Sequence, residues 1–284
     1  MEIQKTYCEI ADLLFCLTTQ SAVSEYYSPH LDPFTVVKNP EAKSLNISFT
    51  CRDDLQVLEW QGRMDDFILW QRGENGTRLG LMGKDKNLGQ MIYANLLWDQ
   101  IRVVSDIANL SAFAGSVGEL VFRICILQHM GLVIHASAIE WNNKGIAFSA
   151  PSGTGKTTQA KLWRNLLGAA ILNGDRPAMR IIEGAPMIYG TPWSGSSPDF
   201  QNASVPLSAI IMLEQDRDNS IRELSNREAI GRLAARAFLP YWDRDLMDLA
   251  LANLEKIIQS VPVYQLHCRP DQEAVELVLQ RVGG

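Results

Sequence analysis

One stretch of nine residues limits the fold of this chain more than any other feature. The stretch reads Ala150-Pro151-Ser152-Gly153-Thr154-Gly155-Lys156-Thr157-Thr158. It follows a short apolar run, Ile146–Ser149, which predicts a strand. It also opens a predicted helix, Lys156–Leu167, that ends at Gly168. A strand, a glycine-containing loop and a helix in this order indicate an α/β domain in which the loop binds phosphate groups.

The residue types in this loop suit phosphate chemistry, and the pattern is that of a P-loop with Ala150 in place of the first glycine. Glycine lets the backbone wrap closely around an anion, so that N–H groups and the helix N-terminus point at it. Lys156 would reach the β- and γ-phosphates, and the Thr157 hydroxyl would be a ligand of Mg²⁺. The alternative is a glycine-rich turn that binds nothing. We predict that ATP is bound by Ser152, Gly153, Thr154, Gly155, Lys156, Thr157 and Thr158.

Hairpin geometry brings a histidine toward the loop. Leu132–Trp141 is a predicted strand, joined by a turn at Asn142–Gly145 to the strand that precedes the loop. If the turn centres on residues 143 and 144, residue 135 pairs with about residue 152. This register places His135 beside the loop, with Ser137 on the same face. Two interpretations stay open: a catalytic imidazole, or a buried histidine bonded to a carbonyl group.

An aspartate follows the next predicted strand, Ala169–Leu172. In doubly wound sheets, the loops at the carboxyl ends of parallel strands line the ligand crevice. A carboxylate there can hold Mg²⁺ directly or through water. We therefore predict that Asp175 is a metal ligand and a catalytic group. The alternative is that Asn173-Gly174 forms a tight turn and Asp175 has no further role.

A second predicted hairpin, Met179–Tyr189, returns the chain toward Asp175. A turn at Glu183–Pro186 pairs residue 175 with about residue 194, so that residues 191–195 lie beside the carboxylate. The tryptophan in this segment is either a stacking wall for a substrate or part of an ordinary Pro/Gly loop. We predict that the acceptor side of the site is formed by Trp193, Ser194 and Gly195.

Arg232 and Arg236 lie one turn apart on a helix predicted to begin with the capping box Ser225–Glu228. Both lie off its apolar stripe. They are either solvated side chains, or one of them offsets charge on a transferred phosphoryl group. The pattern does not choose between the two arginines.

The chain is predicted to consist of two parts. Residues 1–112 contain short β-type segments and predict a smaller, β-rich N-terminal domain of unknown role. From residue 113 onward helical and strand patterns alternate, starting with a helix over Phe113–Met130, which predicts a mixed-sheet α/β domain over 113–284. The candidate strands of the first part are Asn46–Cys51, Val57–Trp60 and Phe67–Trp70.

Composition narrows the function classes further. The formal net charge of −6 argues against a nucleic-acid partner, because phosphate contacts need a basic surface. The five cysteines are scattered without a C-x-x-C pair, so neither a disulfide framework nor a zinc site is expected. Polar residues interrupt the longest apolar stretch, Val121–Ala138, and Met1–Lys5 is unlike a secretory signal. We expect a cytoplasmic protein with no membrane partner.

The stretch Leu132–Asp175 resembles the kinase domain of HPr kinase/phosphorylase and of its relative, ATP-dependent phosphoenolpyruvate carboxykinase. The shared features are a strand with His135-Ala136-Ser137, the Ser-Gly-Thr-Gly-Lys-Thr-Thr loop, and an acidic residue 19 positions after the loop lysine (175 − 156). The later segment Gly190–Gly195, with Val205–Leu213 and the helical tail, is similar to HPr-kinase-like serine kinases, some of which resemble kinases encoded beside lasso-peptide precursors. Together the resemblance covers about residues 115–284. The N-terminal half is not covered by the resemblance.

The resemblance implies that residues 113–284 form an ATP- and Mg²⁺-dependent kinase domain that phosphorylates a hydroxyl, with Ser in a peptide or small protein as the acceptor. Asp175, aided by His135, would accept or orient the hydroxyl proton. The family typically has an Asp-Asp pair where this chain has Gly174-Asp175, which leaves open how metal binding and proton transfer are divided. The carboxykinase Asp-Glu-His-Gly-Trp stretch is absent, which disfavours oxaloacetate chemistry, and no HPr-specific segment is recognised.

Two other functions stay open on the sequence. One is a small-molecule kinase in which the N-terminal domain acts as a lid or as the dimer surface of a homo-oligomer. The other is a sensor or scaffold that binds ATP without transferring it, an interpretation favoured by the absence of the second aspartate of the pair.

Overall fold

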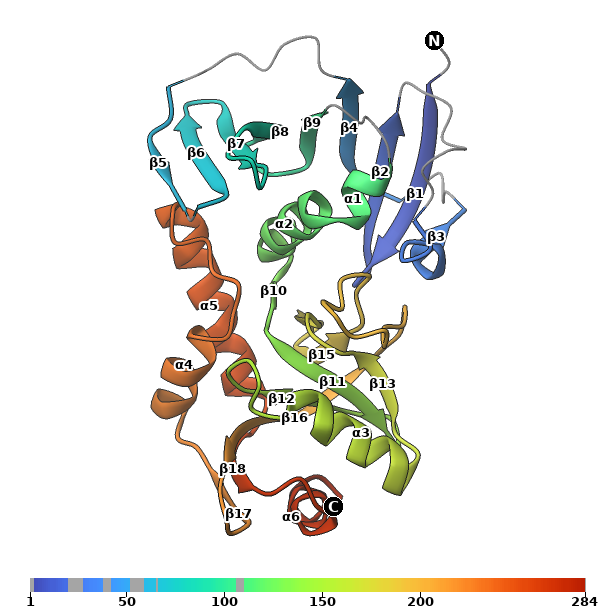
Figure 1. Ribbon diagram of the computed structural model, residues 1–284, viewed down its shortest axis with the longest axis vertical. Helices are drawn as coiled ribbons and strands as arrows, with labels where there is room; N and C mark the ends of the chain where they lie inside the picture. Colours follow the sequence, from blue (N-terminus) through green and yellow to red (C-terminus); the bar gives the residue numbers. More distant parts are fainter. Residues whose placement is uncertain are drawn as a thin grey trace. The chain divides into compact units, whose positions relative to one another are not determined.

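The structure, a computed structural model, describes residues 3–19, 28–37, 42–51, 59–64, 66–105 and 110–283. The chain forms two compact units, and each contains a large mixed sheet. Unit 1 comprises Met1–Gln128 and Pro240–Met247, and unit 2 comprises His129–Leu239 and Asp248–Gly284. The division therefore differs from the predicted one at residue 113. Figure 1 shows the elements of each unit along the chain.

Unit 1 is built on a nine-stranded sheet with the order β3-β1-β2-β4-β9-β8-β7-β6-β5. Strand β4 pairs in parallel with β2 and with β9, and the other described pairs are antiparallel. The strands are β1 (Gln4–Ile10), β2 (Leu13–Thr19), β3 (Thr35–Val36), β4 (Leu45–Cys51), β5 (Gly62–Arg63), β6 (Ile68–Gly73), β7 (Gly76–Met82), β8 (Leu88–Asn95) and β9 (Gln100–Ser105). The strands predicted around 46–51 and 67–70 are confirmed as β4 and β6, whereas residues 57 and 58 of the third candidate lie outside the described residues.

The predicted helix Phe113–Met130 is broken, and its first turns belong to unit 1. It divides into α1 (Leu110–Ala114), α2 (Ser116–Cys125) and a 3-10 turn, Ile126–His129. The break falls at Gly115, which is extended and forms the N-cap of α2. The rings of Phe113 and Phe122 both contact that of Phe15 on β2, and this packing explains why the segment belongs with the first sheet rather than with unit 2.

Unit 2 contains the second sheet and all the residues singled out above for chemistry. Its strand order is β10-β14-β15-β16-β12-β11-β13, with β18 on β16 and β17 on β18. The strands are β10 (Gly131–Val133), β11 (Ala136–Trp141), β12 (Lys144–Ser149), β13 (Ala170–Asn173), β14 (Ala178–Ile182), β15 (Ala185–Tyr189), β16 (Ser204–Gln215), β17 (Ser220–Glu223) and β18 (Val263–Cys268). The helices are α3 (Lys156–Leu167), α4 (Asn226–Ala234), α5 (Arg244–Ser260), whose first residues belong to unit 1, and α6 (Gln272–Val282).

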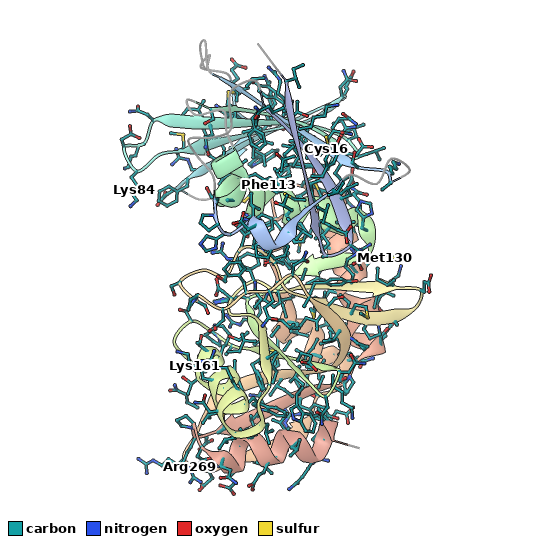
Figure 2. All side chains as sticks on the ribbon, turned by 90° about the vertical axis from the view of Figure 1, so that its right-hand side faces the viewer. Cys16, Lys84, Phe113, Met130, Lys161 and Arg269 are labelled. Atoms are coloured by element: carbon teal, nitrogen blue, oxygen red, sulfur yellow. The ribbon has the colours of Figure 1, made fainter. Side chains whose placement is uncertain are left out.

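Helices α3 and α6 lie side by side and pack on the sheet of unit 2 (Figure 1). The core between them is apolar and includes Phe148, Ile211, Leu266 and Val278. Trp163 of α3 lies at its centre, fully buried, with its ring against that of Phe148. Burying each large apolar side chain contributes about 1.5–3 kcal/mol, so this core holds α3 firmly on the strands. Charged side chains such as Lys161 and Arg269 lie on the exterior (Figure 2).

Strand directions bring three chain segments to one edge of this sheet. Strands β12, β16 and β18 are parallel. Strand β11 lies between β12 and β13 and is antiparallel to both. The amino end of β11 therefore lies at the same edge as the carboxyl ends of β12 and β13. Residue 135, the loop that begins at residue 150 and residue 175 all leave the sheet at this edge.

The two predicted hairpin registers are each wrong by two residues. Ala136 pairs with Ser149, so residue 135 is not opposite residue 152. Ala178 pairs with Tyr189, so residue 175 is not in register with residue 194. In both hairpins the turn uses the two residues directly after the first strand, and all four have positive φ: Asn142, Asn143, Glu183 and Gly184. A two-residue turn with both φ values positive matches the twist of the strands, which is why it is preferred to the later centre.

Candidate functional site

The loop Ala150–Thr158, which we call the phosphate-type loop, leaves β12 and enters α3 as predicted. Gly153 has φ of 79° and Gly155 has φ of 112°, a region that side chains rarely occupy. Gly155 is the N-cap of α3, and in this described segment no side chain caps the helix. A Cβ atom at either glycine would meet nothing within 4 Å. The backbone of the loop thus faces open space and presents the positive end of a helix.

Lys156 points back along the loop. Its Nζ donates to the carbonyl oxygens of Ala150 (3.2 Å) and Pro151 (3.4 Å), and only 7% of the residue is exposed. Burial lowers the pKa of the lysine, the charge of Asp175 opposes that effect, and the charge of Arg236 adds to it. Lys156 is therefore within electrostatic reach of both groups. Of the other predicted loop residues, Thr157 is half-buried and Ser152 and Thr158 are exposed.

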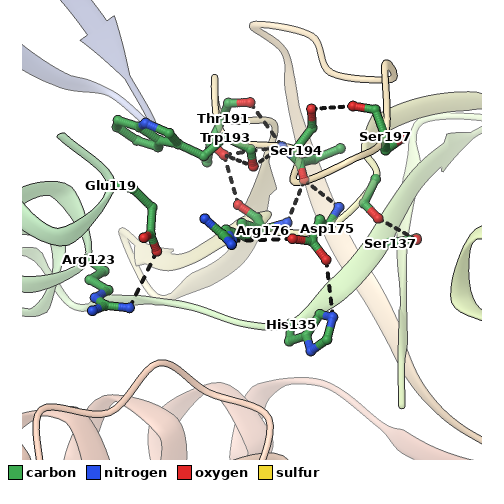
Figure 3. A network of polar contacts seen from close by, with 12 residues as sticks. Glu119, Arg123, His135, Ser137, Asp175, Arg176, Thr191, Trp193, Ser194 and Ser197 are labelled. Atoms are coloured by element: carbon green, nitrogen blue, oxygen red, sulfur yellow. Dashed lines mark hydrogen bonds and ion pairs between the residues drawn. The ribbon is translucent and has the colours of Figure 1, made fainter. Parts of the chain in front are cut away.

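His135 and Asp175 form a direct pair. The imidazole Nε2 lies 3.1 Å from Asp175 Oδ1, and both side chains are partly exposed, at 30% and 24% (Figure 3). The backbone of His135 is held on both sides: its N–H donates to Arg236 O at 2.7 Å, and its carbonyl oxygen accepts from Ser149 Oγ at 3.0 Å. The side chain is thus neither buried nor bonded to a carbonyl group, which removes the second interpretation of this histidine.

The second oxygen of Asp175 lies near Arg176 and close to the backbone of Gly195. Oδ2 lies 3.2 Å from Arg176 Nε, and it would be 2.4 Å from a Cβ atom at Gly195. The hydrogen bond from His135 is the largest cause of the lowered pKa of Asp175. Burial opposes this effect, and the charges of His135, Arg176 and Lys156 add to the lowering. Asp175 is therefore an ionised carboxylate at neutral pH. The guanidinium of Arg176 lies 5.6 Å from the centre of the Phe238 ring, which keeps it in place.

The segment 191–195 comes close to Asp175 despite the wrong register, because the close approach is made at Gly195. Trp193 and Ser194 are 6% and 3% exposed, and Ser194 Oγ donates to Ser197 O at 2.6 Å. Both side chains are therefore buried. Their role on the acceptor side stays a prediction, and in this conformation only Gly195 lies at the carboxylate. Ser137 is buried and donates to Gly174 O at 2.9 Å, which supports the turn before Asp175.

The sequence left open which arginine could act near the loop, and the structure separates the two. Arg232 donates to Gln265 and lies 4.0 Å from Glu214. Arg236 follows α4, and its backbone carbonyl oxygen accepts a hydrogen bond from the N–H group of His135. A pocket of about 520 Å³ lies between the loop, the end of β16 and these arginines. Arg236 is the one whose charge reaches Lys156. Arg176 was missed altogether, although its position next to Asp175 was a usable signal.

None of the helices in the described ranges is both long and apolar enough to span a membrane.

No family model matches the sequence, and no curated protein matches it either. Among solved structures, a match is the HPr(Ser) kinase/phosphatase from Coxiella burnetii, with 10% identity and a TM-score of 0.32. The match covers 52% of this chain and 95% of that one.

Proposed function

We propose that this protein is an ATP- and Mg²⁺-dependent phosphotransferase that acts on a hydroxyl group, with a serine of a peptide or small protein as the acceptor. The observation that carries the proposal is the meeting of three features at one edge of one sheet: the phosphate-type loop, the buried Lys156 and the His135–Asp175 pair. Phosphoryl transfer needs positioning and charge stabilisation more than covalent chemistry, and these groups supply both.

The phosphate-type loop fits a polyphosphate on physical grounds. The open space over Gly153 and Gly155 lets backbone N–H groups approach an anion closely. The uncapped start of α3 adds the partial positive charge of the helix. Lys156 would leave the carbonyl groups of Ala150 and Pro151 for the phosphates, which are better acceptors for a charged donor.

A magnesium ion also fits the donors of this edge. Its preferred ligands are oxygens from one or two protein groups together with phosphates, and the Thr157 hydroxyl and the Asp175 carboxylate are of this kind. Because the pKa of Asp175 is lowered, its carboxylate carries the charge that such a ligand needs. When bound, the ion would shield the charge of the phosphates during transfer.

The His135–Asp175 pair would orient the hydroxyl group of the acceptor. Asp175 has one oxygen on His135 and one beside Arg176, which makes it a weak base. A weak base is sufficient where the transition state is loose and the hydroxyl proton leaves late. His135 would hold the carboxylate in place and share the proton. Arg236 would offset charge on the phosphoryl group from the side of the adjacent pocket.

Incubation with ATP labelled in the γ-phosphate tests the proposal. Peptide and metabolite pools are offered separately with Mg²⁺, and the size of the labelled product identifies the acceptor class. A labelled phosphoserine peptide is expected. Label only in metabolites would point to a small-molecule kinase, and a rise in Tm with Mg²⁺-ATP without any labelled product would point to a non-catalytic nucleotide sensor.

Lys156→Met provides the matched variant. It removes the charge that burial disfavours and keeps the length of the side chain, so we expect a fold at least as stable as the wild type. Transfer should fall by about 1,000-fold because the phosphates lose their main cation. Circular dichroism and thermal unfolding check the fold. Full transfer by this variant would contradict the proposed function.

A further inference from the structure

A fully buried asparagine lies at the centre of the hydrogen bonds around Asp175. Asn173 is the last residue of β13. Its Oδ1 accepts from the backbone N–H groups of Asp175 at 2.9 Å and of Arg176 at 2.7 Å. Its Nδ2 donates to the backbone oxygens of Thr191 at 2.9 Å and of Trp193 at 3.2 Å. One side chain therefore joins two loops that are far apart in the sequence.

The surroundings accept only this orientation of the amide. Two N–H donors face its oxygen and two carbonyl oxygens face its nitrogen, so a flipped amide would lose its hydrogen bonds. Thr191 completes the connection, because its hydroxyl donates to Arg176 O at 2.8 Å and accepts from Asn173 Nδ2 at 3.1 Å. An aspartate at position 173 would place an oxygen against the two carbonyl groups. The site is thus specific for an amide.

The hydrogen bonds act on the backbone that carries the carboxylate. Two successive N–H groups on one acceptor fix the chain at Asp175 and Arg176, and so fix the direction in which the Asp175 side chain leaves it. The Asp175 carbonyl group accepts from the Ala136 N–H at 3.1 Å, next to the histidine. A buried polar group that loses its hydrogen-bond partner raises the free energy of the folded state. The loss of one of these hydrogen bonds therefore weakens the others.

We infer that Asn173 is a positioning residue, which holds the Asp175 carboxylate against His135 and beside Gly195, with Thr191 as the second attachment. Its consequence for phosphoryl transfer rests on the proposed function. Its consequence for the conformation of the two loops does not, and can be measured on the protein alone.

The first measurement is amide hydrogen exchange in Asn173→Ala without any ligand. The N–H groups of Asp175 and Arg176 lose their acceptor, so their exchange should become about tenfold faster or more, and the 191–195 segment should follow. Asn253→Ala is the matched control. Asn253 is another buried asparagine of unit 2 that donates to a backbone oxygen, that of Gly131, and its replacement should leave both loops unchanged.

The second measurement is transfer kinetics. Asn173→Ala should lower kcat by about 100-fold, since a displacement of about 1 Å at a reacting group has an effect of this size. The KM for ATP should stay within about threefold of the wild-type value, because the phosphate-type loop is untouched.

A second pair of variants covers the case in which Asn173→Ala does not fold. Thr191→Val removes the hydroxyl that bonds to Arg176 O, whereas Thr191→Ser retains it. The valine variant should reproduce the faster exchange at Arg176 and a smaller fall in kcat, and the serine variant should restore both.

The outcomes separate this inference from the proposed function. Faster exchange at Asp175 and Arg176 in the alanine variant and unchanged exchange in Asn253→Ala support the inference even if the wild type transfers no phosphoryl group, a result that would overturn only the proposed function. Unchanged exchange at these amides, or equal loosening in Asn253→Ala, overturns the inference. An active wild type whose kcat does not change in Asn173→Ala also overturns it.

Discussion

Two carboxylates, one in each unit, each contact a basic side chain but differ in partner and surroundings. In unit 1, Asp243 accepts from Arg72 Nη1 at 2.8 Å and from the N–H of Leu246 at 3.0 Å, and its side chain is 3% exposed. In unit 2, Asp175 is partly exposed, and its partner His135 is too. The first carboxylate thus caps the start of a helix and ties that segment to β6, whereas the second lies at an open edge.

On the proposed function, this difference separates a structural ion pair from one that takes part in the reaction. Asp243 accepts hydrogen bonds from a guanidinium group and from a backbone N–H group. In the same unit, the ring centres of Trp70 and Trp242 lie 6.2 Å apart. Asp175 pairs with an imidazole that is itself partly exposed, and it lies where the strand ends of an α/β sheet converge. The exposure of the carboxylate and the kind of partner, rather than the presence of an ion pair, therefore favour a functional role for Asp175.

The largest effect is expected at Asp175. Asp175→Asn keeps the shape of the side chain and its backbone bonds but removes the charge that would hold Mg²⁺ and orient the acceptor. The rate of phosphoryl transfer should fall by about 1,000-fold, while the Tm changes little. Steady-state kinetics and thermal unfolding measured on one preparation check this. A rate close to that of the wild type would place Asp175 with Asp243 as a structural group.

The two arginines should then differ. Arg236→Gln should lower kcat by about 100-fold, because its charge reaches Lys156 and the phosphate-type loop. Arg232→Gln is the matched control, since the guanidinium of Arg232 is bonded to Gln265, and its kcat should stay within about threefold of wild type. Equal losses in the two variants would contradict the assignment of Arg236.

In unit 1 we expect the replacement of the carboxylate to lower stability and to leave the transfer rate unchanged. Asp243→Ala removes a helix cap and a buried hydrogen bond to Arg72, so the free energy of unfolding should fall by about 2 kcal/mol. The kcat of the folded variant should be unchanged. Urea unfolding monitored by tryptophan fluorescence measures the first quantity. A loss of kcat without a loss of stability would show that the comparison of the two carboxylates is wrong.

The smallest effect is a shift along the pH axis. His135 is the main cause of the lowered pKa of Asp175, so His135→Gln should raise that pKa toward the ordinary value. If the ionised carboxylate is required, the acid limb of the rate profile moves to higher pH.

A carboxylate with a lowered pKa stabilises the fold above its unfolded pKa of about 3.9 and loses this contribution as the pH falls through the folded value. Unfolding at pH 5 and pH 3 should therefore show a larger acid loss in the wild type than in Asp175→Asn.

Local features of the chain were predictable where the signals themselves are local. Helix α3 begins at Lys156 and ends before Gly168 as expected, because glycine N- and C-caps define both ends. The capping box at Ser225 and Glu228 is present at the start of α4. In contrast, β17 was not predicted, since its four residues show no alternation of buried and exposed positions.

The sequence alone determined the strand–loop–helix unit around Lys156 and the presence of a histidine and an aspartate near strand ends, because glycine torsions, caps and apolar periodicity act over a few residues. Only the tertiary structure decided the hairpin registers, the unit to which residues 113–128 belong, and which arginine contacts the backbone of His135. Those outcomes depend on which turn geometry suits the twist of two strands and on charges and packing between segments tens of residues apart. Neighbouring residues in the chain carry no record of such distances.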